Sequence, residues 1–226
     1  MTLEPRSPLP LPPATPLAPP PDMGARLAAI GVTLPAGAAA SLGGFLAHLL
    51  AMNELVNLTA ITEPNEAWSR HVLDALSLVP LLADLPAGAR VLDVGSGGGV
   101  PGIPLAIARP DLHVTLLDAT EKKVAFLRAV TTALGLPNVD AVSGRAEEVD
   151  LGPIFDVVVA RAVAKLPTLL GWTAPLAKRG GRLLLIKGAR AEDELKEAGA
   201  RLRQLRCTHE RTVATPTGRI LVLRCR

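Results

Sequence analysis

The spacing of hydrophobic residues along the chain changes near residue 90. Before this point, apolar side chains recur at helical spacing in residues 25–30, 36–52 and 66–82. After it, short runs rich in Val, Ile and Leu alternate with helical stretches, which is typical of a parallel sheet covered by helices on both faces. The pattern predicts a helical N-terminal part followed by a doubly wound α/β domain.

The α/β part contains strands that alternate with helices and then a closing hairpin. The strands are expected at residues 90–94, 113–118, 139–143, 155–160, 182–187, 207–214 and 219–224. The helices are expected at residues 101–109, 121–135, 166–176 and 191–204. This order indicates a Rossmann-like, mostly parallel, seven-stranded sheet.

The beginning of the chain is rich in proline, including the run Pro19-Pro20-Pro21. Proline fixes φ and removes a backbone donor, so this segment is expected to be an extended, disordered arm. The sequence accordingly divides into a disordered Pro-rich arm at 1–22, a helical N-terminal extension at 23–84, and the α/β domain at 85–226.

Composition narrows the class of protein. The 226 residues are 49% hydrophobic and 20% charged, as expected for a globular chain with one main domain. The uncharged stretch at residues 34–53 contains His48 and several glycines, which favours a buried helix over a membrane span. Cys207 and Cys225 lack CxxC spacing and no secretory segment is recognised, so a cytoplasmic location is expected. The histidines have no metal-ligand spacing, and no metal is expected.

Positive charge is concentrated towards the end of the chain. The net charge is only +3, but lysine and arginine outnumber acidic residues over residues 178–226. This asymmetry suggests contact with a polyanion, although a solvated arginine-rich face is the simpler explanation of the charge alone. Binding of nucleic acid therefore needs support from other motifs.

A glycine-rich turn follows the first predicted strand. The strand ends at Asp93-Val94 and runs into Gly95-Ser96-Gly97-Gly98-Gly99, where glycine permits positive φ and close approach of the backbone to a ligand. Asp118 ends the next strand, where a carboxylate can accept hydrogen bonds from both hydroxyls of a ribose. Together these features imply a cofactor that contains adenosine.

Two residues favour S-adenosylmethionine over a nicotinamide dinucleotide. A turn that binds pyrophosphate needs the pattern GxGxxG, but position 100 is Val. A carboxylate at Asp93 would repel a pyrophosphate, yet it can order the loop near the cationic methionine end of S-adenosylmethionine. The expected chemistry is methyl transfer with S-adenosylhomocysteine as product, and a nicotinamide oxidoreductase is the disfavoured alternative.

Motifs across about residues 45 to 195 resemble one family, the RsmG (GidB) family of small-subunit rRNA guanine-N7 methyltransferases. The resemblance implies a class I methyltransferase fold and methylation of N7 of a guanine in bacterial 16S rRNA, guanine 527 in the usual rRNA numbering. The motifs are Asn57-Leu58-Thr59-Ala60-Ile61, Arg70-His71-Val72-Leu73-Asp74, Gly95 to Pro104, Leu117-Asp118-Ala119-Thr120, Lys122 to Phe126, Gly144-Arg145-Ala146-Glu147-Glu148, Ala160-Arg161-Ala162-Val163-Ala164 and Ile186-Lys187-Gly188.

The resemblance and the glycine turn together define the expected site. Ala75 and Gly98 depart from the family pattern, which commonly has Ser and Pro there. The residues expected to hold the cofactor are Asp93, Gly95, Gly97, Val100, Asp118, Ala119, Thr120, Ala146, Glu147 and Arg161. The residues expected to act on the RNA or in catalysis are Arg145, Arg161 and Lys187, with Lys122 also facing RNA.

The expected chemistry needs few catalytic groups. Guanine N7 carries a lone pair and no proton, so attack on a sulfonium methyl requires positioning and electrostatics instead of a general base. Arg161 and Lys187 could grip phosphate or donate to guanine O6, although Arg161 could instead pair with Glu147. His71 and Asp74 lie one helical turn apart, and a local hydrogen bond or cap between layers is the favoured interpretation.

Other functions remain open on the sequence. A small-molecule methyltransferase or another RNA methyltransferase could share this fold and cofactor site, since neither fixes the substrate. A noncatalytic RNA-binding or assembly factor could also retain the fold. The expected partner is small-subunit rRNA or the 30S particle, with no membrane role and a monomeric state.

Overall fold

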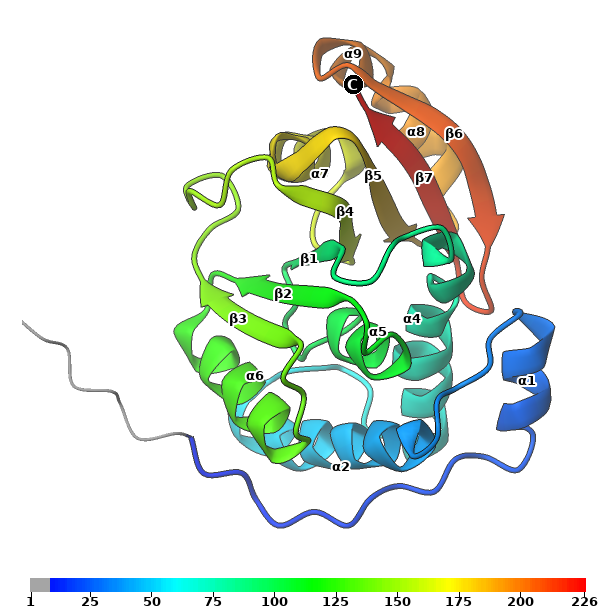
Figure 1. The fold of residues 1–226 in the computed structure, drawn as a ribbon, viewed down its shortest axis with the longest axis vertical. Helices are drawn as coiled ribbons and strands as arrows, with labels where there is room; N and C mark the ends of the chain where they lie inside the picture. The colour runs from blue at the N-terminus through cyan, green and yellow to red at the C-terminus, as the bar shows by residue number, and fades with distance from the viewer. Residues whose placement is uncertain (1–8) are drawn as a thin grey trace, which may run out of the picture.

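The computed structural model describes residues 9–226, so the part of the predicted arm at 1–8 lies outside the described residues. Its centre is one sheet with the strand order β3-β2-β1-β4-β5-β7-β6 (Figure 1), in which β7 alone runs antiparallel to its neighbours β5 and β6. This confirms the predicted seven-stranded, mostly parallel α/β fold. The strands are β1 (Arg90–Val94), β2 (His113–Asp118), β3 (Val139–Ser143), β4 (Phe155–Arg161), β5 (Ala177–Lys187), β6 (Cys207–Ala214) and β7 (Arg219–Cys225).

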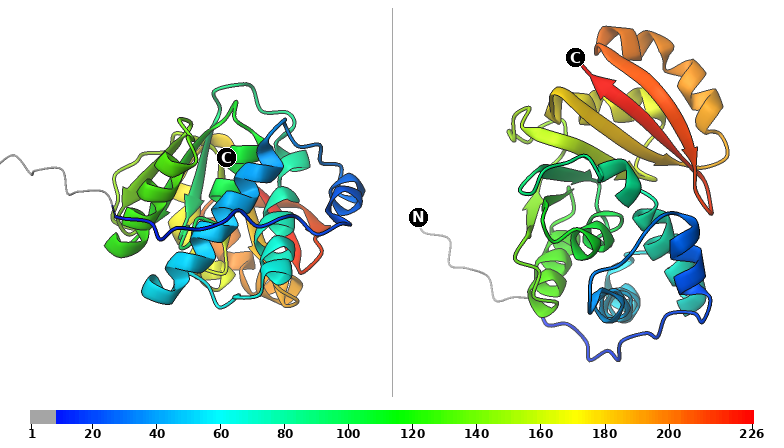
Figure 2. Two further views of the ribbon diagram at one scale, coloured as in Figure 1. Left: turned by 90° about the horizontal axis from the view of Figure 1, so that it is seen from below. Right: turned by 45° about the vertical axis from the view of Figure 1, so that its right-hand side comes forward.

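Helices cover both faces of the sheet (Figure 2), and the strands alternate their side chains between two hydrophobic layers. On β4, Val157 and Val159 pack with the N-terminal helices, α5 and α6, while Val158 and Ala160 pack with α7, α8 and α9. The helices are α1 (Met23–Ala29), α2 (Ala38–Val56), α3 (Pro64–Ala67), α4 (Asp74–Leu76), α5 (Gly102–Ala108), α6 (Glu121–Ala133), α7 (Leu166–Thr173), α8 (Ala191–Glu197) and α9 (Gly199–Gln204).

The helix predicted at residues 66–82 is interrupted. Between α3 and α4 the chain forms a π-helical turn at Trp68–Leu73, and a short 3₁₀ helix follows at Val79–Leu82. Glu63 caps α3 by accepting a hydrogen bond from the backbone N–H of Glu66. Such π-helical turns are frequent at functional sites because the extra residue turns side chains to a new direction.

Residues 9–22 differ from the disordered arm expected from their prolines. They run along α2 (Figure 1), and the N–H of Leu17 donates to the carbonyl of Gly43 at 3.1 Å. Leu9, Leu11 and Leu17 also pack against the core. The absence of a side chain at Gly43 allows this approach, since a Cβ there would lie 2.3 Å from the carbonyl oxygen of Leu17. Leucines placed between the prolines supply the apolar contact.

Helix α2 is long and apolar enough, by length and composition, to cross a membrane. In the structure it contacts α5 and α6, and its residues Leu42, Phe45, Leu46 and Leu49 are fully buried. The hydrophobic core therefore accounts for its apolar character, as the sequence predicted for a buried helix.

Candidate functional site

The glycine turn after β1 depends on backbone conformations that favour glycine. Gly95, Gly97 and Gly99 have φ of 72°, 55° and 90°. A Cβ at Gly95 would lie 2.7 Å from Cγ2 of Val163, which comes from the loop after β4. The turn therefore lies tightly against the loop that follows the neighbouring strand, at the carboxyl edge of the sheet.

Asp118 lies at the end of β2 and orders two loops. Its Oδ2 accepts from the N–H of Gly97 at 2.9 Å, and its Oδ1 accepts from the N–H of Thr120 at 2.8 Å. Each carboxylate oxygen can accept a second hydrogen bond. Asp118 is thus held rigidly while keeping acceptor capacity for a diol.

A first cavity, of about 230 Å³, opens beside Asp118. Six of the residues expected in the site line it together: Gly95, Asp118, Ala119, Arg145, Ala146 and Glu147. Trp172 of α7 also lines this cavity, whereas Trp68 is buried in the core. Trp172 is therefore a cavity residue that the motifs in the sequence do not reveal.

Arg145 does not join Arg161 and Lys187. Its side chain is 63% exposed and lies 3.8 Å from Oε1 of Glu147. Arg145 and Glu147 therefore form an exposed pair at the first cavity, and Arg161 makes no ion pair with Glu147, contrary to the alternative that the sequence left open. Thr120, at the start of α6, is exposed and contributes its backbone to Asp118.

A second cavity, of about 200 Å³, adjoins the first at Gly95. It is lined by the expected residues Gly95, Gly97, Val100 and Arg161, and also by Leu58, Thr59, His71 and Lys123. The loop after α2 forms one side because Oδ1 of Asn53 accepts from the N–H groups of Leu58 and Thr59. The helical extension therefore completes a cavity whose other side is the glycine turn.

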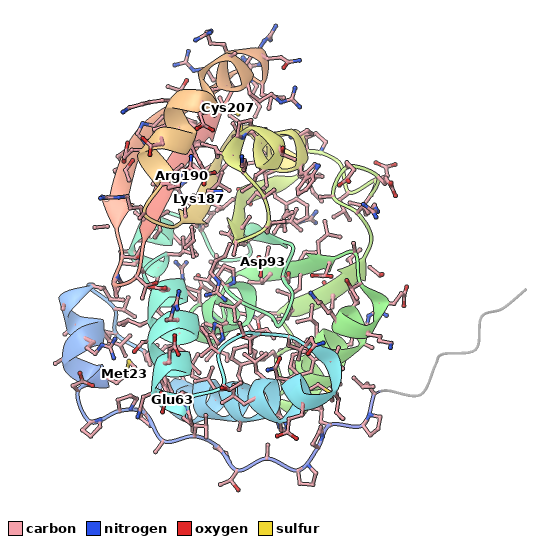
Figure 3. All side chains as sticks on the ribbon, turned by 180° about the vertical axis from the view of Figure 1, so that it is seen from behind. Met23, Glu63, Asp93, Lys187, Arg190 and Cys207 are labelled. Carbon is pink, nitrogen blue, oxygen red and sulfur yellow. The ribbon has the colours of Figure 1, made fainter. Side chains whose placement is uncertain are left out.

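Asp93 lies within the sheet, in the middle of the molecule (Figure 3). It is not among the residues that line either cavity. It is fully buried, and its Oδ2 accepts from the N–H of Gly102 at 2.9 Å, at the start of α5. Burial raises the pKa of Asp93 to about 7, against the lowering effects of the Gly102 hydrogen bond and of Arg161. Asp93 therefore binds the backbone of the segment that follows the glycine turn.

Arg161, at the end of β4, is held by the helical extension. Its Nη1 donates to the carbonyl of Arg70 at 2.7 Å, and its Nη2 lies 3.0 Å from Nδ1 of His71. Because arginine only donates, Nδ1 accepts and Nε2–H of His71 donates to Oγ1 of Thr59, 2.8 Å away. Burial, together with the charges of Arg161 and Arg70, lowers the pKa of His71 to about 3. His71 is therefore neutral.

A third cavity, of about 490 Å³, lies on the other side of Arg161. It shares Arg161 and Ala162 with the second cavity and Val163 with the first. Its remaining lining includes Arg70, Asp74, Lys165, Lys187, Glu194 and Thr217. The loop after β4 thus separates two smaller cavities from one larger cavity.

Lys187, at the end of β5, lines this larger cavity but is only 8% exposed. Its Nζ donates to the carbonyl of Ala164 at 2.7 Å and pairs with Oε2 of Glu194 at 2.7 Å. The same Oε2 accepts from the N–H of Leu166. Lys187 and Glu194 therefore anchor the loop that follows Arg161.

Of the two interpretations favoured for His71 and Asp74, the structure shows contacts between layers and no local hydrogen bond between the two side chains. His71 bonds Thr59 and Arg161, whereas Oδ2 of Asp74 accepts from the hydroxyl of Thr217 in the β6–β7 hairpin. The π-helical turn, Trp68–Leu73, contains His71 and is followed directly by Asp74. Their hydrogen bonds therefore connect the helical extension to β4 and to the hairpin.

The cysteines lie away from these cavities. Cys207 and Cys225 pair across β6 and β7 with their Sγ atoms 3.1 Å apart, and both are free thiols. At the other end of β7, Arg219 lies opposite Lys187 of β5 in the strand register, beside the larger cavity. Within residues 9–226, no three His, Cys, Asp or Glu side chains are grouped as a metal site.

The family model and the relatives that match this chain carry the same name. A family model, GidB, described as "rRNA small subunit methyltransferase G", matches residues 38–221. A protein of Sorangium cellulosum named "Ribosomal RNA small subunit methyltransferase G" is 57% identical over 222 residues, covering 97% of this chain and 93% of that protein. A protein of the same name from Serratia proteamaculans is 44% identical over 172 residues, covering 76% and 82%.

Solved structures share the fold. A SAM dependent methyltransferase from Aquifex aeolicus has a TM-score of 0.54 and 19% identity, with 72% of this chain and 93% of that chain covered. TYW2 of P. horikoshii, in complex with MeSAdo, has a TM-score of 0.53 and 14% identity, with 64% and 60% covered. At these identities the likeness establishes the class I methyltransferase fold.

Proposed function

The chain belongs to the GidB family of rRNA small subunit methyltransferases, and from this premise we propose that it methylates N7 of a guanine in bacterial 16S rRNA, using S-adenosylmethionine. Membership of the family supports an S-adenosylmethionine-dependent enzyme acting on small-subunit rRNA. The finer target, guanine 527 in the usual rRNA numbering, is what the family resemblance implies.

One observation carries the proposal: the cavities beside the glycine turn and the larger cavity meet at Arg161, Ala162 and Val163. A methyl donor on one side of this loop and a base on the other would meet at the carboxyl edge of the sheet, where ligands of such folds bind. The larger cavity has about 490 Å³, and the four cationic side chains on its lining, Arg70, Arg161, Lys165 and Lys187, outnumber the two carboxylates, Asp74 and Glu194. A polyanionic substrate fits this charge.

The residues present fit S-adenosylmethionine. Asp118 keeps two free acceptor positions for ribose hydroxyls, and Ala119, Ala146 and Trp172 offer apolar walls for an adenine. Gly95 and Gly97, with Val100, would border the methionine part, and Asp93 would hold the turn beneath it. Bound there, the cofactor supplies an electrophilic methyl group on a positively charged sulfur.

The chain's own residues would position and orient the base. Guanine N7 has no proton to lose, so a general base is unnecessary. Arg161 keeps unused N–H donors beyond those given to Arg70 and His71, and they can bind guanine O6 or a phosphate. Lys187 would act by holding Ala164 and Glu194 in place. Arg145 would act at the exposed rim of the first cavity, beside Glu147.

The decisive experiment maps 16S rRNA from cells with and without this protein. We expect N7-methylguanosine at position 527 only when the protein is present, detected by cleavage at the modified base or by mass spectrometry of fragments. An Asp118→Ala variant serves as the matched control, because it removes the proposed ribose acceptor and should leave the position unmethylated. Methylation at 527 that persists without the protein, or that appears elsewhere with it, contradicts the assignment.

Location and assembly are part of the proposal. An enzyme that modifies the small ribosomal subunit would work in the cytoplasm as a monomer on rRNA or on a 30S particle. Sedimentation of the purified protein, alone and with 30S subunits, tests the monomeric state and the binding to the 30S particle, and fractionation of cells tests the location.

A further inference from the structure

Asp74 has a carboxylate oxygen that the protein leaves without a partner. The side chain lines the larger cavity and is 3% exposed. Its Oδ2 accepts from Thr217, whereas its Oδ1 is buried and has no hydrogen-bond partner among the described residues. A buried acceptor without a donor is costly, and its presence in a substrate cavity points to a donor that arrives with the substrate.

The surroundings of Asp74 do not neutralise this oxygen. The ion pairs formed by residues 9–226 do not include Asp74. Burial raises the pKa of Asp74, while the hydrogen bond from Thr217 and the charges of Arg161 and Arg70 act in the opposite direction. Two N–H groups of Arg161 are directed to Arg70 and His71, and Arg161 forms no hydrogen bond with Asp74. The structure therefore keeps a carboxylate in the cavity with capacity for further hydrogen bonds.

The other carboxylate in the cavity is already engaged. Oε2 of Glu194 pairs with Lys187 and accepts from the N–H of Leu166. Glu194 thus holds the loop after β4, while Asp74, which like Glu194 lines only the larger cavity, keeps an oxygen without a partner among the described residues. If N7 of the guanine faces the loop of Arg161 to Val163, the opposite edge of the base, which carries N1–H and the N2 amino group, faces away from that loop.

We infer that Asp74 is a specificity-determining residue that accepts hydrogen bonds from N1–H and the N2 amino group of the target guanine. This inference rests on the proposed function and names the group that selects the base. Guanine presents two donors on this edge, which match the two acceptor oxygens of a carboxylate. Adenine has an unprotonated N1 and no 2-amino group, so its lone pair would face the carboxylate and be repelled.

The test compares guanosine with inosine at the target position of the small-subunit RNA, using the full-length enzyme. Inosine lacks the 2-amino group but keeps N1–H, O6 and N7. The wild type should methylate guanosine with a kcat/KM at least about tenfold above that for inosine, because a hydrogen bond to a carboxylate is lost. In Asp74→Asn this ratio should fall towards one, while the Kd for S-adenosylhomocysteine stays unchanged.

Glu194→Gln is the matched control, a carboxylate of the same cavity whose replacement should leave the guanosine-to-inosine ratio at the wild-type value. A ratio that is unchanged in Asp74→Asn, or that collapses instead in Glu194→Gln, overturns the inference. If Asp74→Asn does not fold, the wild-type ratio decides, because equal methylation of both bases overturns the inference without any variant. If the wild type methylates neither RNA at N7, the proposed function fails as well, and the two failures are thereby distinguished.

Discussion

At the scale of single residues, Arg161 is oriented by groups outside its own domain. The carbonyl of Arg70 and the imidazole of His71 belong to the helical extension, whereas Arg161 ends β4 of the sheet. The neutral imidazole accepts from Arg161 on one side and donates to Thr59 on the other. A protonated imidazole would have no acceptor for Arg161, which explains why a lowered pKa suits this position.

His71 variants should separate these two hydrogen bonds. His71→Asn places an acceptor near the position of Nδ1, and His71→Gln places a donor near the position of Nε2. If the bond to Arg161 positions the base, kcat should rank wild type, then Asn, then Gln and Ala, with about a 100-fold loss in the last. Single-turnover assays with saturating cofactor measure this, and a ranking that follows melting temperature instead would assign His71 a purely structural role.

Asp93 should make folding stability depend on pH. Burial raises its folded-state pKa to about 7 from 3.8, so between these values the folded protein holds a proton that the unfolded chain has released. Its contribution is therefore greatest below about pH 4, declines as pH rises to about 7, and is constant above that. The difference in unfolding free energy between wild type and Asp93→Asn, measured in urea from pH 4 to 8, should decline over this window. A flat difference would contradict the raised pKa.

At the scale of elements, the site is made of loops at the ends of strands and of the extension that covers them. The glycine turn follows β1, Asp118 ends β2 and Arg161 ends β4, so parallel strands bring them to one edge. The loop after α2 and the π-helical turn then close this edge from the other side. The cavities are therefore formed by elements from both parts of the chain.

Gly95→Ala should disrupt the turn through contact as well as conformation. Alanine at φ 72° costs about 1–2 kcal/mol, and its Cβ would also lie 2.7 Å from Val163. Gly88→Ala is the matched control: φ is 79°, but apart from its two chain neighbours no residue of 9–226 has a heavy atom within 4 Å of the added Cβ. Both variants should lose stability, but only Gly95→Ala should weaken cofactor binding in calorimetry. Equal cofactor affinity in the two would argue against a cofactor beside Gly95.

At the scale of the whole molecule, one hydrophobic layer joins the extension to the sheet. Phe45, Trp68 and Leu76 of the extension belong to the same cluster as Val157 and Val159 of β4. The boundary at residue 84 thus separates two sequence patterns, while the core is continuous across it. The basic residues of the C-terminal part lie at two separate places. Arg219 is the strand neighbour of Lys187, at the end of β7 beside the larger cavity. Arg226 donates its backbone N–H to the carbonyl of Arg206, at the opposite end of β7.

This division of charge leads to a prediction for RNA binding. Lys165 is exposed and lines the larger cavity, while Arg203 is exposed on α9, which leads into the other end of the sheet. Lys165→Gln should reduce the dependence of log Kd on log salt by about 0.7–0.9 if it contacts a phosphate. Arg203→Gln should leave the slope unchanged. Filter binding of 16S RNA fragments at several salt concentrations measures both slopes. If the slope falls in Arg203→Gln and stays unchanged in Lys165→Gln, the RNA binds at the C-terminal helices instead.

The sequence alone determined the features that depend on local pattern. Alternating apolar runs defined the strands to within a few residues, except that β5 begins at Ala177 instead of at 182, where pairing with Phe155 extends it past a bulge. The glycine turn and Asp118 were equally visible, because turn conformation and the carboxyl end of a strand are properties of adjacent residues. Together with the family motifs, these defined the fold and the expected cofactor.

Tertiary structure alone decided which distant side chains meet. It placed Trp172 at the cofactor side, joined Lys187 to Glu194, separated Arg145 from Arg161, and brought Thr217 to Asp74. It also brought Leu17, in a segment whose prolines predict disorder, into hydrogen-bonding contact with Gly43. These contacts join segments far apart in sequence, and their energies depend on distance and burial, which residue types and spacing do not specify.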